Sequence, residues 1–331
     1  MSTLEHARRL ASARRWSDLA QLVDSIDSEE ITRSAELAYL LADGLRRTGH
    51  VERARPLAVD ADRSAFLSGD VRLGLRTLNL LGMIAFEAGQ VEEADRHFGA
   101  LLERATEAGD DEFAARASNN LGILANIRGE TELALTSYQR ALAAYERIGY
   151  TRGLAQTYYN LGISYRDLGF AEEADSHFDR AILHADESHS EDVLALAETE
   201  RASLRARAGD GHLAESIASR ALARLERMAD PAGAANAKRV LATAAQARGA
   251  NALALERLDE ALATLGSHPD PLLRAEIQRD RGSLLRHLGD MDGACAAYRT
   301  ALDAYLRIGA TAEADALRLL LSEIPCPEAD L

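Results

Sequence analysis

Small and apolar residues recur along this chain with a fixed period of 40 residues. Seven glycines are spaced 40 residues apart; each follows an alanine or glycine by seven residues and precedes an alanine by five. These glycines are Gly49, Gly89, Gly129, Gly169, Gly209, Gly249 and Gly289. Three residue positions therefore recur with the same 40-residue spacing over most of the chain. This pattern predicts repeats that stack and bury a continuous core between neighbours.

Each period is predicted to form two helices joined by a tight turn at the glycine. In the second full unit we expect a first helix over about 70–88 and a second over about 91–107. Gly89 supplies the positive φ that ends the first helix. The N-caps expected before the first helices are Ser28, Asp70, Asp110, Ser190, Asp230 and Asp270.

The period also predicts the domain organisation. Residues 1–27 are expected to form N-terminal capping helices, and residues 28–310 seven repeats. Residues 311–323 are expected to form a C-terminal capping helix, and residues 324–331 a flexible tail. In this organisation the repeats supply the core, and the end helices cover it.

Two places depart from the regular pattern. Pro56 falls inside the second helix of its unit, where it is expected to bend or delay that helix. In the unit around Gly209, the first helix carries Glu200 and Arg201 where other units have Asn-Leu or Leu-Leu. We therefore expect looser packing or a bend in that unit.

Composition narrows the classes of partner. The net charge of −15 argues against nucleic acid and anionic membranes as partners, and no apolar run is long enough to span a bilayer. Cys295 and Cys326 provide no disulfide framework and no zinc spacing. The first 16 residues lack the apolar core of a signal peptide. These features predict a soluble cytoplasmic protein with reduced cysteines.

The motif within each period resembles the tetratricopeptide repeat. Leu161-Gly162, Tyr165, Gly169, Ala174 and Phe178 follow the order of that family's pattern. The period is 40 rather than about 34 residues, because six residues extend the end of each unit. This variant resembles the repeats of kinesin light chain and the sensor regions of some bacterial regulators. The resemblance implies an all-α fold, a right-handed superhelical solenoid of stacked antiparallel helix pairs.

In this family a partner usually lies along the concave face, which the first helices line. Asparagine matches the donor and acceptor of a peptide unit, and arginine can hold a carboxylate at two points. The predicted partner-binding residues are Arg76, Asn79, Arg116, Asn119, Asn120, Asn126, Tyr159, Asn160 and Arg166. Equivalent positions in the first helices of the repeats are occupied by Tyr39, Arg46, Gln156, Arg239, Arg279 and Arg286. The alternative interpretation is a solvated helix face.

Other chemistry receives little support from the sequence. The segment from His184 to Asp192 gathers histidines and carboxylates that could attract a divalent metal, but polar residues are expected in such an extension. The turn Gly209-Asp-Gly211 lacks the context of a phosphate loop. We expect no metal, no cofactor and no enzymatic activity.

Three functional hypotheses remain open. The first is a non-enzymatic scaffold or adaptor that holds a protein or peptide segment with acidic groups in its concave groove. The second is a peptide-responsive regulatory sensor that acts in trans on a transcription or signalling protein. The third is a self-assembling scaffold, a homo-oligomer formed through the end helices.

Overall fold

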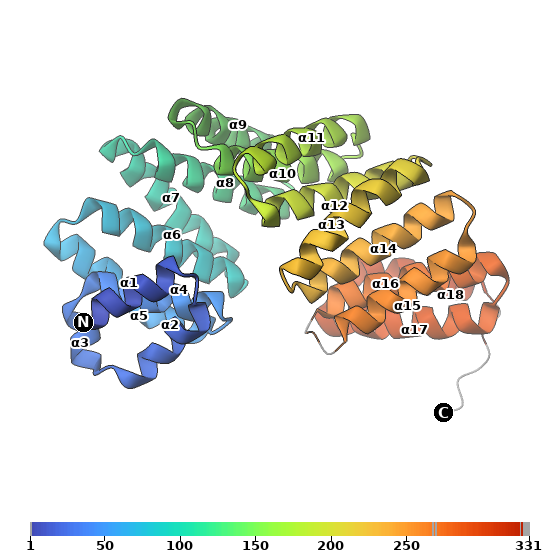
Figure 1. Cartoon of the computed structure of the whole chain (residues 1–331), viewed down its shortest axis with the longest axis horizontal. Coiled ribbons are helices and arrows are strands. Elements are labelled where there is room, and N and C mark those ends of the chain that lie inside the picture. The colour runs from blue at the N-terminus through green and yellow to red at the C-terminus, as the bar shows by residue number, and fades with distance from the viewer. Residues whose placement is uncertain (1, 267, 269, 325, 327–331) are drawn as a thin grey trace. The chain divides into compact units, whose positions relative to one another are not determined.

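The computed structural model describes residues 2–266, 268, 270–324 and 326. Within these residues the regular structure comprises eighteen α-helices and one 3-10 helix, with no strand. The chain divides into two compact units, Met1–Ser164 and Tyr165–Leu331, and each is described separately (Figure 1).

The first unit begins with short helices and continues as regular pairs. Its helices are α1 (Thr3–Ser12), α2 (Trp16–Leu22), the 3-10 helix η1 (Val23–Ser25), α3 (Ser28–Arg33), α4 (Ala35–Arg47), α5 (Val51–Ser68), α6 (Val71–Glu87), α7 (Val91–Ala108), α8 (Asp111–Ile127), α9 (Thr131–Ile148) and most of α10 (Thr151–Asp167).

The second unit repeats the same alternation. Its helices are α11 (Ala171–Glu187), α12 (Glu191–Arg207), α13 (Gly211–Arg227), α14 (Pro231–Ala247), α15 (Asn251–Leu265), α16 (Pro271–Leu288), α17 (Met291–Ile308) and α18 (Thr311–Ser322). Consecutive helices of this unit lie side by side as antiparallel pairs in Figure 1. The all-α solenoid of stacked helix pairs is therefore confirmed.

The glycine turns follow the prediction. All seven glycines of the 40-residue series have positive φ, from 74° at Gly89 and Gly129 to 87° at Gly209. Helices α6 and α7 begin and end within one residue of their predicted bounds. The turn therefore depends on glycine because its backbone conformation is one that a side chain disfavours.

Most predicted N-caps form their hydrogen bond, and the exceptions have local reasons. Asp70 accepts from the backbone N–H of Leu73, and Asp110, Asp230 and Asp270 act in the same way. Ser28 does not cap a helix: α3 begins at this residue, and Asp27 is the cap. Ser34 then caps a separate helix, α4, so the first repeat opens with two helices instead of one. The Ser190 side chain makes no capping bond, and its Oγ lies 2.9 Å from Ser188 Oγ.

The small residues of the pattern make room for the large ones. Phe98, Tyr138, Phe178, Leu258 and Tyr298 are all buried, as predicted. A Cβ atom added at Gly82 would lie 2.4 Å from Phe98 Cε1, and one at Gly122 would lie 2.6 Å from Tyr138 Cε1. The first helix of a pair can therefore approach its neighbour closely only because these positions lack a side chain.

The two irregular places behave differently from each other. Helix α5 runs from Val51 to Ser68 with Pro56 inside it. In the unit around Gly209, Glu198 is 2 % exposed and accepts from both Arg220 and Arg224. These bonds join α12 and α13 at a buried carboxylate, and the looser packing or bend expected in this unit stays a prediction.

The cysteines correct the sequence analysis. Cys295 and Cys326 form a disulfide, with Cα atoms 5.6 Å apart and a sequence separation of 31. The pairing arises because the chain turns back after α18, where Ile324 is buried and Glu323 pairs with Arg286. Spacing in sequence does not reveal such a return. A disulfide also removes the argument for a reducing compartment.

The C-terminal tail falls mainly outside the described residues. Of the predicted flexible segment, 324–331, the structure describes only Ile324 and Cys326, and both have the fixed contacts given above.

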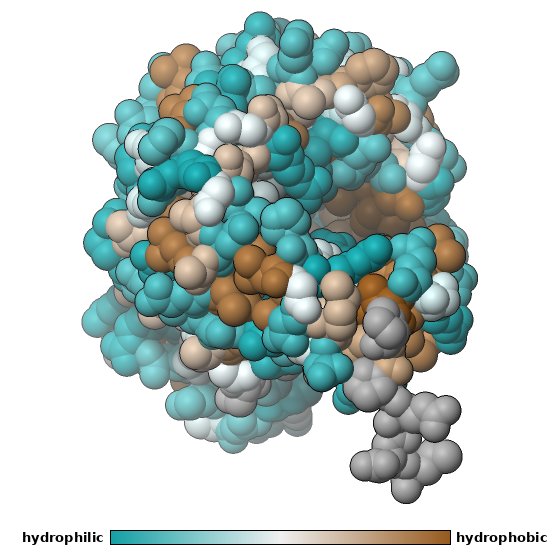
Figure 2. Space-filling model, turned by 90° about the vertical axis from the view of Figure 1, so that its right-hand side faces the viewer, coloured by the Kyte–Doolittle hydropathy of each residue, from teal (hydrophilic) through white to brown (hydrophobic). Residues whose placement is uncertain are grey.

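In the described part of the chain, no helix is long and apolar enough to cross a membrane. The face in Figure 2 is mostly hydrophilic, with apolar residues scattered over it.

Candidate functional site

Two neighbouring cavities in the first unit form the candidate site, which we call the first-unit groove. One has a volume of about 420 Å³ and the other about 160 Å³, and Asn79 and Arg116 line both. The first is also lined by Tyr39, Arg72, Arg76, Glu112 and Phe113. The second is also lined by Met83, Asn119, Asn120, Tyr145, Tyr150, Arg152, Gly153 and Gln156. Most of these residues come from the first helices of successive pairs, α4, α6, α8 and α10.

The groove carries positive charge in an acidic protein. Its lining includes four arginines and one carboxylate, Glu112, which accepts from Arg116 at 2.7 Å. Arg72 and Arg76 form no ion pair within the described residues. Glu36 interacts with Arg76 electrostatically without forming an ion pair with it. An anion entering the groove would therefore meet two guanidinium groups that are not held in an ion pair.

Aromatic rings hold the two central guanidinium groups in place. Arg76 lies 4.2 Å from the ring centroid of Tyr39, and Arg116 lies 5.6 Å from Phe113 and 5.8 Å from Tyr150. Burial opposes the charged form of Arg116, but its interactions with Tyr150 and Glu112 keep its pKa above the ordinary value. These contacts fix both side chains before any partner binds, which lowers the entropy cost of binding.

The asparagines bond chiefly to one another. Asn160 Nδ2 donates to Asn119 Oδ1 at 3.0 Å, and Asn120 Nδ2 reaches Asn79 Oδ1 at 3.4 Å. Thr157 Oγ1 also donates to Asn119 Oδ1, at 3.2 Å. These bonds link successive first helices, so the asparagines help to stack the repeats. Asn119 and Asn160 are buried, and this limits the groups they can offer to a partner.

The predicted residues divide into three groups. Arg76, Asn79, Arg116, Asn119 and Asn120 line the first-unit groove, and Asn160 lies behind it through its bond to Asn119. The other three are not among the lining residues of either cavity. Asn126 and Tyr159 are partly buried, and Arg166 belongs to the second unit, where it pairs with Glu200 and Asp167.

The second unit has its own polar cavity, of about 630 Å³, along α12, α14 and α16. Arg239 donates to Asp280 at 3.0 Å, and Arg279 donates to the same carboxylate at 2.8 Å. Arg166 is paired with Glu200. Three of the arginines that line this cavity are therefore already neutralised by carboxylates of the protein.

Several lining residues escaped the sequence analysis. Arg72 lies one turn before Arg76 on the same face of α6, and helical spacing could have identified it. Tyr150 and Arg152 lie at the end of the six-residue extension, outside the first-helix positions that face the groove in each repeat. Tyr145 belongs to the second helix of its pair, α9, and burial raises the pKa of its phenol, so it enters the groove as a neutral ring.

The possible metal segment also has a definite structure. His184 Nδ1 lies 3.0 Å from Glu187 Oε2, one turn further along α11. In the residues that the structure describes, no three metal-ligating side chains come together. His184 and Glu187 lie on neighbouring turns of one helix.

Comparison with known proteins agrees with the repeat pattern. Models of the tetratricopeptide repeat match residues 75–147 and residues 155–183. Among curated proteins, no sequence matches the chain significantly.

Three solved structures illustrate the similarity of fold. A signal transduction ATPase of the STAND class with a tetratricopeptide repeat sensor, from Pyrococcus horikoshii, is 14% identical with a TM-score of 0.68. That match covers 95% of this chain and 48% of the ATPase, so this chain spans about half the length of that protein. A Rap protein complexed with competence and sporulation factor is 14% identical with a TM-score of 0.61, and the match covers 97% and 96% of the two chains.

The third structure is the apo form of RapI. It is 14% identical with a TM-score of 0.67, and the match covers 83% of this chain and 98% of RapI. Identities this low establish the fold and nothing finer. The two matched segments contain the glycines and alanines that define the 40-residue period. Residues 75–147 and 155–183 are therefore tetratricopeptide repeats, and the solved structures share the fold along most of the chain.

Proposed function

We propose that this chain is a non-enzymatic scaffold or sensor that holds a protein or peptide segment in the first-unit groove. The segment carries an acidic side chain or a free C-terminal carboxylate. The observation that carries this proposal is that Arg72 and Arg76 line the groove and form no ion pair within the described residues, in a chain whose net charge is −15.

The groove provides three kinds of contact for such a segment. Arg76 and Arg116 supply planar donors for a carboxylate. Asn119 Nδ2 and Asn120 Oδ1 have no partner within the described residues and can pair with a peptide unit. The rings of Tyr39 and Phe113 offer apolar contact beside the charges. Charge would select the partner, and the amides would orient its backbone.

Two proteins with a similar fold favour a regulatory sensor as the second candidate. The Rap protein is complexed with competence and sporulation factor, and the STAND ATPase carries its repeats as a sensor. Both share this fold along more than nine-tenths of the present chain. A sensor would use the same groove and would pass the binding signal to a second protein.

Selection from a random peptide library with free C-termini tests the proposal. The wild-type protein is expected to enrich peptides with Asp, Glu or a required C-terminal carboxylate. Replacing Arg76 and Arg116 by Ala should weaken binding of a selected peptide by at least about tenfold, because each charged hydrogen bond contributes about 1.5–3 kcal/mol. Isothermal titration measures the change.

Arg279→Ala in the second unit is the matched control, since Arg279, like Arg116, lines a polar cavity and pairs with a carboxylate, but it lies outside the first-unit groove. It should bind the selected peptide as the wild type does. The proposal fails if the enriched peptides show no acidic preference, or if the control loses as much affinity as the groove variant.

A further inference from the structure

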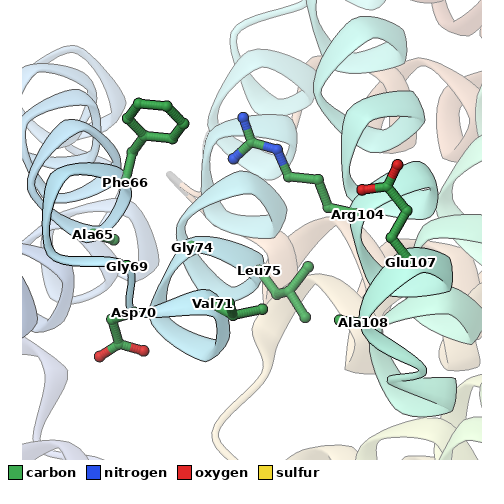
Figure 3. A pocket seen from close by; sticks show the side chains of 10 residues that line it. All are labelled: Ala65, Phe66, Gly69, Asp70, Val71, Gly74, Leu75, Arg104, Glu107 and Ala108. Atoms are coloured by element: carbon green, nitrogen blue, oxygen red, sulfur yellow. The ribbon is translucent and has the colours of Figure 1, made fainter.

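The first unit exposes an apolar corner beside a cavity that is separate from the first-unit groove. Phe66 is 71 % exposed and Leu67 78 %, at the end of α5, and Val71 is 60 % exposed at the start of α6. Phe66 and Val71 line a cavity of about 480 Å³, which we call the Phe66 niche, together with Gly74, Leu75, Arg104 and Glu107 (Figure 3). Large apolar side chains exposed together usually mark an interaction site.

The other repeats show that the fold does not require this apolar corner. In the next four repeats the residues at the position of Phe66 are Thr106, Glu146, Asp186 and Glu226. At the position of Leu67 they are Glu107, Arg147, Glu187 and Arg227. All eight are polar or charged, whereas the last repeat has Leu306, which is 46 % exposed, at the position of Phe66 and Arg307 at the position of Leu67. None of these five repeats has apolar residues at both positions, as the repeat of Phe66 and Leu67 does.

Gly74 leaves open space in the wall of the niche. A Cβ atom added at Gly74 would meet nothing within 4 Å, although Gly74 itself is buried. The corresponding residues in later repeats have side chains: Ala114, Leu154, Leu194, Ala234 and Arg274. A benzene ring fits a cavity of about 150 Å³. The Phe66 niche therefore has room for a phenylalanine and a leucine side chain.

Charges of both signs border the niche. Arg104 and Glu107 project from one face of α7, three residues apart, and neither forms an ion pair within the described residues. Arg104 lies 6.0 Å from the ring centroid of Phe66, and Figure 3 shows its side chain extending toward that ring. The rim is therefore complementary to itself: a two-fold axis would place Arg104 of each copy opposite Glu107 of the other.

We propose that the Phe66 niche is a homodimer contact. Phe66 and Leu67 of each copy enter the niche of the second copy, and two Arg104–Glu107 pairs close the rim. The contact lies at the turn between α5 and α6, not at the end helices, and it leaves the first-unit groove open. One small corner on each copy gives a weak, concentration-dependent dimer.

Sedimentation velocity over about two orders of magnitude in protein concentration tests the contact. The wild type should shift from monomer to dimer. Phe66→Glu with Leu67→Arg, the pair found at Glu146 and Arg147, should weaken the dimer by at least tenfold. Gly74→Leu should do the same by filling the cavity. Thermal melting shows whether each variant is folded.

A charge swap separates self-pairing from any other use of the niche. Arg104→Glu or Glu107→Arg alone should weaken the dimer, and the double variant should recover it. Leu133→Glu is the control, because Leu133 is exposed in the same unit but does not line the niche. A monomeric wild type at every concentration overturns the proposal. So does a double variant without recovery, a Gly74→Leu dimer as tight as the wild type, or a control that weakens the dimer equally.

Discussion

Replacing Gly82 by valine is expected to destabilise the protein by more than about 3 kcal/mol, since overpacking a tight core costs about 1–3 kcal/mol and valine adds two further methyl groups. The added Cβ alone would lie 2.4 Å from a ring atom of Phe98, a buried side chain that packs between α6 and α7. Neither the ring nor the helix can move without separating the pair. Urea unfolding, followed by circular dichroism, measures the loss.

Gly74 on the same helix provides the matched control. Its Cβ would meet open space, so Gly74→Ala should stabilise the protein by about 0.5–1 kcal/mol through helix propensity alone. Combining Gly82→Val with Phe98→Ala should recover part of the loss, because the double variant removes the clash. If Gly82→Val and Gly74→Ala unfold at the same urea concentration, the close approach of the helices is not what the glycine provides.

The second large effect is expected in the second unit, at the buried charge of Glu198. Arg220 Nε donates to Glu198 Oε1 at 3.0 Å, and Arg224 Nε donates to Oε2 at 3.2 Å. Replacing both arginines by Ala leaves a carboxylate that is 2 % exposed without a cation, which should cost about 3–5 kcal/mol. The same urea titration measures this loss.

Adding Glu198→Leu to that double variant should restore most of the stability, because an apolar side chain at a buried site needs no partner. Arg227→Ala is the control: its contact with Glu191 is exposed on both sides, and such pairs contribute at most about 1 kcal/mol. If removing both Arg220 and Arg224 costs no more than removing Arg227, Glu198 does not depend on them.

The sequence was sufficient to predict the helix pairs, because their determinants are local and recur seven times. A glycine at a fixed place ends each first helix, and an aspartate begins many of the next. The first repeat was harder to predict, since Ser34 breaks what the period describes as one helix. The disulfide was missed because it depends on the path of the chain after α18.

The groove was predicted only in part, for a geometric reason. The position of a residue within its repeat indicates which face of its helix it occupies. It does not indicate which residue of the adjacent helix lies opposite. Asn160 meets Asn119, and Asn120 meets Asn79, each 41 residues away, so amides expected to face a partner pair with each other. The ion pairs of Glu198 and the Phe66 niche could not be predicted for the same reason, because both depend on residues of a neighbouring helix.

The central claim is that the partner lies in the first-unit groove, and photo-crosslinking tests it most directly. A selected peptide carrying a photoreactive phenylalanine would be crosslinked to the full chain, and the modified residues would be identified by mass spectrometry. We predict crosslinks to Tyr39, Asn79, Met83 and Phe113, and their loss when Arg76 and Arg116 are both replaced by Ala. Crosslinks confined to the second-unit cavity or to the Phe66 niche, or crosslinks that persist in that variant, would contradict the account.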